Sequence, residues 1–225
     1  MIWHAWHWLR HIGARVSRKP NDVLGADPRM ELIASIKAAF EGDPQSFINK
    51  TADPKTTDIT MIGTVVQLYC YADFNGRRIV DVLRHAALGE PRSASRLQDA
   101  QVFPMLTKLV INHLPESDLK SGLLNASETI EMHQIHRHNF AHWMVRRVKG
   151  ENALVMFSTN SKEAERRDGA PLDPKEAKFG ILALDGFDAE VEKLKEHTNY
   201  LARTAAMLER EVDKLRDSLV SLKER

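Results

Sequence analysis

The chain has 225 residues, 43% hydrophobic and 28% charged, so it can fold around a substantial apolar core. Its formal net charge of +1 excludes a basic surface over the whole molecule, and any nucleic-acid surface must therefore be local. The single cysteine, Cys70, excludes an internal disulfide framework and fits a reducing cytoplasm, and no stretch approaches the roughly 18 apolar residues of a membrane span.

Residues 1–29 read as an N-terminal extension that is disordered or non-native. Its first twelve residues carry three of the four tryptophans together with His4, His7 and His11. On a helix these histidines would share a face, so a metal clip is the alternative interpretation. Turn-forming residues follow, and we expect the folded domain to start near Met30.

Apolar residues at helical spacing predict a mostly helical domain over residues 30–208. Asn75-Gly76 falls inside the longest apolar-periodic stretch and predicts a kink there. Cys70, in the same stretch, is expected to be a packed core thiol. The segments with helical spacing are Met30–Phe40, Ile59–Leu88, Phe103–Leu114 and Ser127 to about Arg147, and those that read as broken or loop-like are Glu41–Asp58 and Gly89–Ser95.

Two short apolar segments bounded by turn residues, Ala153–Ser158 and Phe179–Leu184, predict a small β-hairpin at about 153–184. The twenty residues between them mix both signs of charge, which is typical of a solvated loop. The fold class expected from these patterns is all-α, a helical bundle with a small β-hairpin insertion.

A long helix from about Asp188 ends the chain, with apolar positions alternately three and four residues apart. Its early part is expected to close the bundle. Residues 209–225 would continue it as a coiled-coil-like extension that mediates self-association, with a solvated tail as the alternative. The apolar positions are Val191, Leu194, Thr198, Leu201, Ala205, Leu208, Val212, Leu215, Leu219 and Leu222.

The most informative segment runs from Arg137 to His142, RHNFAH. An arginine presents a planar fork of donors that matches a phosphate, and a histidine side chain exchanges protons near neutral pH. Together they could cleave RNA without a metal, because Arg137 would neutralise a phosphate and His142 would move the proton of the ribose 2′-hydroxyl or of the leaving oxygen. Five residues along a helix rotate the side chain by about 140°, so Arg137 and His142 diverge within one protomer. A helix end or distortion near Trp143 could bring them together, and so could a two-fold dimer that places two copies of the motif in one cleft.

Three further cations follow the motif, Arg146, Arg147 and Lys149, and give the local positive charge that an RNA backbone requires. A surface salt bridge of Arg137 and a packed or capping His142 form the alternative interpretation. Glu131, His138 and His142 could contribute to a metal site, but no second helix offers matching ligands, and His85 stands alone. The chain has no phosphate-binding glycine loop and no nucleophile elbow.

The arginine, the polar residue after it and the histidine of the motif, followed by Trp143 and a strand pair, resemble the HEPN (higher eukaryotes and prokaryotes nucleotide-binding) family over roughly Met30 to Leu208. The resemblance implies an up-and-down helical bundle that dimerises through the motif. Many members are metal-independent endoribonucleases of toxin–antitoxin or phage-defence systems, some paired with a nucleotidyltransferase antitoxin. No cofactor or metal is implied.

On that template His142 is the general acid/base, Arg137 stabilises the phosphorane and His138 orients the substrate, giving 2′,3′-cyclic phosphate ends. The alternative is a non-catalytic HEPN-like module that binds a nucleotide, RNA or a partner protein.

Overall fold

The computed structural model describes residues 27–90, 94–162, 165 and 178–223. The predicted N-terminal extension, including His4, His7 and His11, lies outside these residues except for 27–29, and so does most of the loop between the two predicted strands. The described chain is mostly helical, as its apolar spacing predicts, and it also contains a small four-stranded antiparallel sheet. In the part described, no helix combines the length and apolarity needed to cross a membrane.

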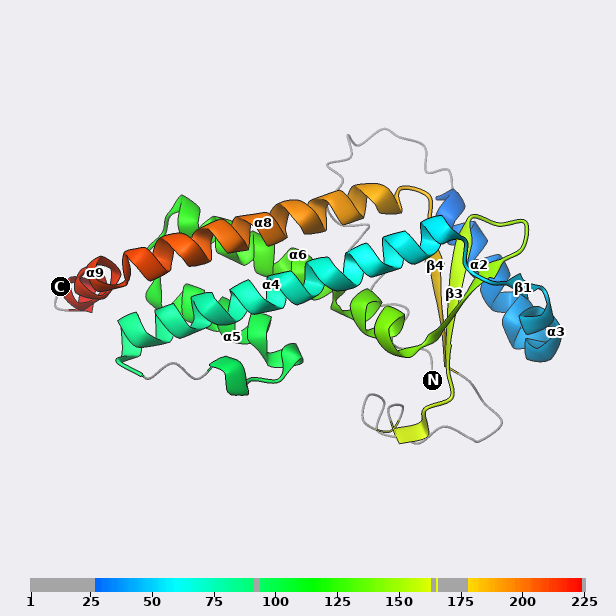
Figure 1. Cartoon of the computed structure of the whole chain (residues 1–225), viewed down its shortest axis with the longest axis horizontal. Helices are drawn as coiled ribbons and strands as arrows, with labels where there is room; N and C mark the ends of the chain where they lie inside the picture. The colour runs from blue at the N-terminus through cyan, green and yellow to red at the C-terminus, as the bar shows by residue number, and fades with distance from the viewer. Residues whose placement is uncertain (1–26, 91–93, 163–164, 166–177, 224–225) are drawn as a thin grey trace.

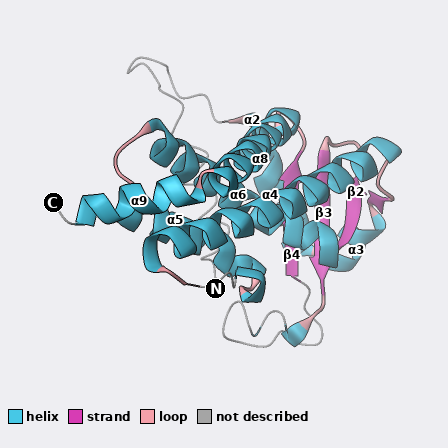
Figure 2. Cartoon of the chain, turned by 60° about the vertical axis from the view of Figure 1, so that its left-hand side comes forward, coloured by secondary structure: helices cyan, strands magenta, loops and turns pink. Residues whose placement is uncertain are grey.

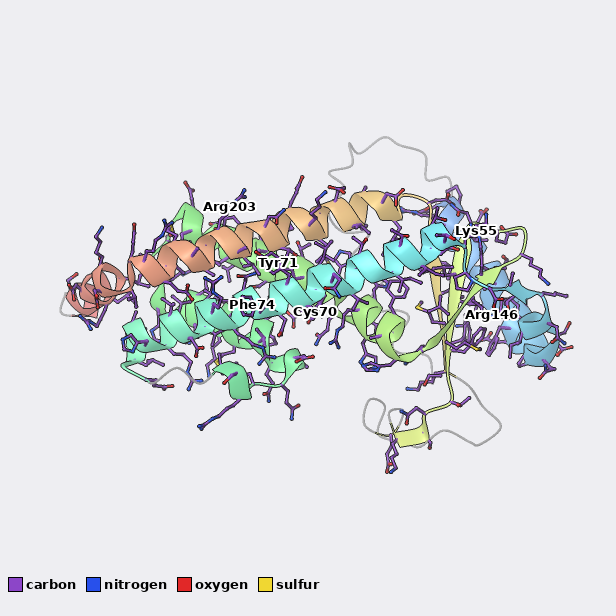
Figure 3. All side chains as sticks on the ribbon, in the orientation of Figure 1. Lys55, Cys70, Tyr71, Phe74, Arg146 and Arg203 are labelled. Atoms are coloured by element: carbon purple, nitrogen blue, oxygen red, sulfur yellow. The ribbon has the colours of Figure 1, made fainter. Side chains whose placement is uncertain are left out.

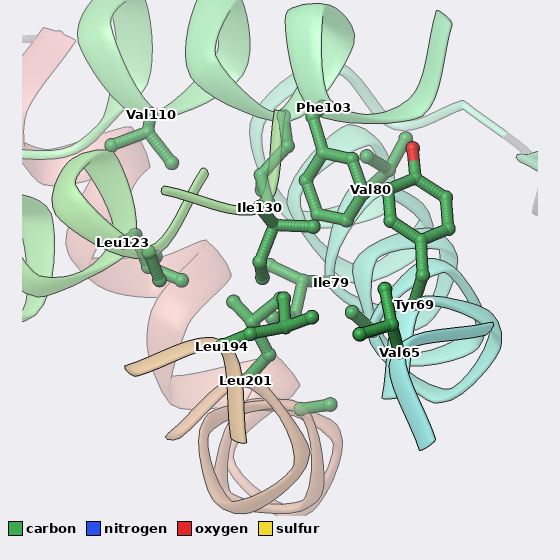
Figure 4. Close-up of a cluster of buried hydrophobic side chains, with 14 of the residues drawn as sticks. Val65, Tyr69, Ile79, Val80, Phe103, Val110, Leu123, Ile130, Leu194 and Leu201 are labelled. Carbon is green, nitrogen blue, oxygen red and sulfur yellow. The ribbon is translucent and has the colours of Figure 1, made fainter. Parts of the chain in front are cut away.

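Four helices enclose the main core: α4 (Thr56–Leu88), α5 (Asp99–His113), α6 (Asp118–His142) and α8 (Phe187–Arg210). Helices α4 and α8 lie side by side and run in the same direction from the sheet end of the molecule, whereas α6 runs opposite to α8 (Figure 1). The core consists of large apolar side chains from all four helices. Those labelled in Figure 4 include Tyr69, Ile79, Phe103, Ile130 and Leu194.

Helix α4 continues through Asn75-Gly76 from Thr56 to Leu88, so this pair does not end the helix. Gly76 is instead the point where α5 approaches closely, because a Cβ added there would lie 3.1 Å from Cγ1 of Val102. Asn75 is buried beside it and donates from Nδ2 to the Tyr71 carbonyl oxygen at 2.8 Å. The interruption in the sequence therefore serves helix packing.

The exposed face of α4 corrects the prediction for Cys70, which is exposed rather than packed in the core. Figure 3 labels it beside Tyr71 and Phe74 on the same helix. Tyr71 is 48% exposed and Phe74 is 58% exposed. Both lie off the core face of α4, which the buried residues Tyr69 and Ala72 form in this part of the helix.

The sheet is larger than the predicted hairpin (Figure 2). Strands β3 (Ala153–Ser158) and β4 (Lys178–Ala183) form the hairpin, and β2 (Met144–Val148) and β1 (Thr51–Ala52) extend it in the order β1-β2-β3-β4. The motif helix therefore ends at His142, not near Arg147, because Trp143 turns to an extended conformation and β2 pairs with β3.

Side chains of β3 are buried on both faces of the sheet. Val155 and Phe157 pack against α2 (Pro28–Gly42) and α3 (Pro44–Asn49), and Leu154 and Met156 join the helical core. Helix α2 confirms the helix predicted from Met30. Helix α3 and strand β1 replace part of the loop predicted before α4. Helix α5 begins at Asp99, four residues before its predicted start, so Pro104 lies inside the helix rather than in its first turn.

The C-terminal periodicity is divided between two helices. Helix α8 ends at Arg210, and α9 (Val212–Lys223) follows as a separate helix, so the described part of the predicted extension beyond Arg210 does not continue α8. The apolar positions of α8 from Val191 to Leu208 are buried in the main core. Leu219 of α9 packs with Ala86 and Ala87 of α4, which means that this end of the pattern also serves contacts within the chain.

Candidate functional site

The last turns of α6 hold all three residues of the predicted catalytic motif. Ser117 caps the helix by accepting a hydrogen bond from the Lys120 backbone N–H, and the helix ends when Trp143 takes an extended conformation. His138 and His142 lie one turn apart, and their ring centroids are separated by 4.7 Å. His142 is exposed and His138 is half-buried, so the pair lies at the surface.

Arg137 points to a different side of α6, towards α4 and α5. Its Nη2 lies 3.4 Å from Oδ2 of Asp99, and its guanidinium carbon lies 5.8 Å from the ring centroid of Tyr69. Among the described residues, the buried Nε of Arg137 has no hydrogen-bond partner. The guanidinium is thus held in place while part of its donor fork stays unsatisfied.

A polar cluster between α4 and the start of α5 fixes this arginine. Arg77 pairs with Asp73 at 2.7 Å and with Asp99 at 3.0 Å, so Asp99 lies between two guanidinium groups. Burial raises the pKa of the Tyr69 hydroxyl, so this ring meets Arg137 as a neutral phenol. The spacing of Asp73 and Arg77 is visible in the sequence, but their relation to Arg137 depends on how α4, α5 and α6 pack.

The structure brings His138 and His142 together, but it does not bring Arg137 to them. Within the described chain, the charged and aromatic contacts of Arg137 go to Asp99 and Tyr69, and the ring contact of His142 goes to His138. The two directions follow from the five-residue separation of Arg137 and His142 on one helix. A single protomer therefore does not direct Arg137 and His142 to one point.

The three predicted RNA-binding cations hold strand β2 in place. Arg147 reaches the buried carboxylate of Asp58 at 2.6 Å and also donates to Asn152. Arg146, labelled in Figure 3, ion-pairs with Asp53. The Lys149 ammonium lies 3.5 Å from the carbonyl oxygen of Asn49. Of the two arginines, Arg147 has the more deeply buried partner, because the Asp58 side chain is only 5% exposed.

The metal-site alternative does not gain a ligand set from the fold. Over the described residues, no three His, Cys, Asp or Glu side chains lie close enough together to hold a metal ion. Glu131 is the acidic residue of the metal-site alternative, beside His138 and His142. Burial raises the pKa of its carboxyl.

Comparisons with family models, with curated proteins and with solved structures find no match to this chain.

Proposed function

We propose that the chain is an HEPN-like, metal-independent RNA endonuclease built as an up-and-down helical bundle. The observation that carries the proposal is the His138–His142 pair at the surface, 4.7 Å apart between ring centroids, on the same helical segment as Arg137. Imidazole groups at the surface can reach an RNA backbone and transfer protons without a metal.

The reaction begins when the ribose 2′-hydroxyl attacks the adjacent phosphorus while His142 accepts its proton. The bond from phosphorus to the 5′-oxygen breaks, and His142 returns the proton it accepted to the leaving oxygen. The products are a 2′,3′-cyclic phosphate and a 5′-hydroxyl. Arg137 stabilises the negative charge of the phosphorane, and His138 orients His142 and the substrate.

Two copies of the chain complete the site. Arg137 and His142 diverge within one protomer, but a two-fold axis beside α6 would place Arg137 of one copy near His142 of the other. Ile135 lies on the same outer face of α6 as His138 and is 43% exposed, and Met144 just beyond the helix is 53% exposed. These apolar side chains support a homodimer contact beside the histidines. A cytoplasmic location and an antitoxin or nucleotidyltransferase partner belong to the same proposal.

The test is incubation of the purified protein with total RNA in excess EDTA. We expect cleavage that leaves cyclic phosphate ends, and His142→Ala should lower its rate by roughly 10²- to 10⁴-fold. His113→Ala is the matched control, because His113 also lies in the last turn of a helix, outside the site. Equal cleavage by parent and His142→Ala protein would refute the proposal.

The contact of Arg137 with Asp99 favours one second candidate, a non-catalytic HEPN-like module that binds a nucleotide, RNA or a partner protein. An arginine committed to a neighbouring carboxylate can bind a phosphate without supporting turnover. Intact RNA in every lane, with saturable RNA binding that is weakened in Arg137→Gln, would establish the module instead.

A further inference from the structure

A cavity of about 100 Å³ lies between α2, α6, β4 and the start of α8. It faces a different side of α6 from the His138–His142 pair, since its α6 residues are Met132, His133 and His136. Its walls combine an apolar floor with charged groups at the two helix N-termini. The apolar lining side chains are Met30, Ile33, Met132, Leu182, Ala183 and Phe187.

His133 is the unusual polar group of this cavity. It is only 5% exposed, and within the described chain neither of its ring nitrogens has a hydrogen-bond partner. Its Nε2 lies 4.0 Å from Oε2 of Glu190, which is too far for a direct hydrogen bond. Burial lowers the pKa of His133, so at neutral pH the ring is uncharged and one nitrogen presents a lone pair.

Glu190 leaves one oxygen for a ligand. Its Oε1 accepts from the Lys193 ammonium at 2.9 Å, whereas Oε2 is the atom that faces His133. A single donor group placed between Nε2 of His133 and Oε2 of Glu190 could donate one hydrogen to each, provided that it carries at least two hydrogens.

The charges of the wall select the sign of that donor. Asp27, Asp185 and Glu190 line the cavity together with one cation, Arg29, which pairs with Asp27 at 3.1 Å. Lys193, outside the lining, pairs with Glu190, so the carboxylates exceed these two cations by one. Asp27 also caps α2, and Asp185 accepts from Asn152 at 2.7 Å. The remaining negative charge beside His133 disfavours an anion and favours a cation.

We propose that this cavity binds a small primary amine, with its ammonium between His133 and Glu190 and its short alkyl chain against Met132, Leu182 and Phe187. A dry protein cavity of about 150 Å³ holds benzene. The smaller volume here therefore suits an aliphatic chain of about four carbons. The site is separate from the proposed nuclease site, and its occupancy does not depend on RNA cleavage.

The probe is n-butylamine, titrated into the full chain at pH 7.5 and followed by amide and histidine-ring NMR shifts. 1-Butanol and butyrate have the same chain length without the positive charge. We expect saturable shifts from the amine and at least tenfold weaker binding of the alcohol and the acid. Glu190→Gln should weaken amine binding by about 10- to 100-fold, the usual effect of losing a charged hydrogen bond.

Glu192→Gln is the matched control, because Glu192 lies on the same helix, outside the cavity, and pairs with Lys195. It should bind the amine like the parent. Equal binding of amine and alcohol, an unchanged affinity in Glu190→Gln, or no saturable amine shift would each overturn the proposal. If Glu190→Gln does not fold, Glu190→Asp keeps the charge, withdraws it by one methylene and should also weaken binding.

Discussion

At the scale of single residues, Arg147 is a cation that the fold uses for itself. Its guanidinium compensates Asp58, whose side chain is 5% exposed and which also accepts from the Lys55 backbone N–H at the start of α4. The pair joins β2 to α4 next to the end of the motif helix. A buried carboxylate that loses its partner keeps its desolvation cost, so this contact should matter more for stability than surface pairs do.

Arg147→Met should therefore lower the free energy of unfolding by about 3 kcal/mol, measured by urea denaturation. The control is Arg216→Met, which removes a 48%-exposed arginine that pairs with Asp213 and should change stability by less than about 0.5 kcal/mol. If both variants unfold alike, Arg147 does not stabilise the fold and its assignment to RNA binding gains support.

Buried histidines give the protein a pH-dependent stability. Burial lowers the pKa of His136 to about 3, and it also lowers the pKa of His133 and His197. An unfolded histidine titrates near 6.5, so below that pH the unfolded chain binds protons that the folded chain does not. The free energy of unfolding should therefore fall as the pH drops from about 6.5 towards 3, and be insensitive to these groups above 6.5.

His136 contributes up to about 1.4 kcal/mol per pH unit in that window. Urea denaturation at pH 7.5, 6 and 5 measures the slope. His136→Phe should reduce the slope between pH 6 and 5 whatever its effect on absolute stability. A slope identical to that of the parent would show that His136 is protonated in the folded protein.

At the scale of helices and strands, periodicity predicts the long helices and fails where the conformation of a segment depends on a pairing partner. The apolar spacing of α4 and α8 is visible locally, since each helix turns its own stripe to the core. Strand β2 was missed because Met144–Val148 directly follows a helical pattern and its strand character depends on pairing with β3. The break at Glu211 is also invisible, because the heptad spacing continues across it.

The two glycines of α4 allow a direct test of the α4–α5 contact. Gly63→Ala should stabilise the protein by about 0.5–1 kcal/mol, because nothing lies within 4 Å of the added Cβ and alanine favours the helix. Gly76→Ala has the same helical gain but must displace Val102 and Phe103, and we expect a net loss of about 1 kcal/mol. Thermal denaturation of both variants measures these changes in stability. Equal stabilisation by the two substitutions would mean that Val102 and Phe103 of α5 move aside at no cost.

At the scale of the whole molecule, the sequence shows the order of the motif residues but not which side chains surround them in the fold. Arg137, His138 and His142 are found from their order on one helix, whereas Asp99 and Tyr69, which hold Arg137, come from helices that only the tertiary fold brings near. The divergent directions of Arg137 and His142 bear on the proposed assembly, since in that proposal Arg137 of one protomer and His142 of its partner form one site.

Mixing two inactive variants tests that assembly. Arg137→Gln and His142→Ala should each lack cleavage as homodimers, because every shared site then loses one member. A heterodimer of the two has one site with both residues intact, and random exchange in an equal mixture makes about half of the dimers heterodimers. The mixture should recover about a quarter of parental activity per chain. If the site lay within one protomer, each chain would still lack one residue and mixing would restore nothing, provided that circular dichroism shows both variants folded.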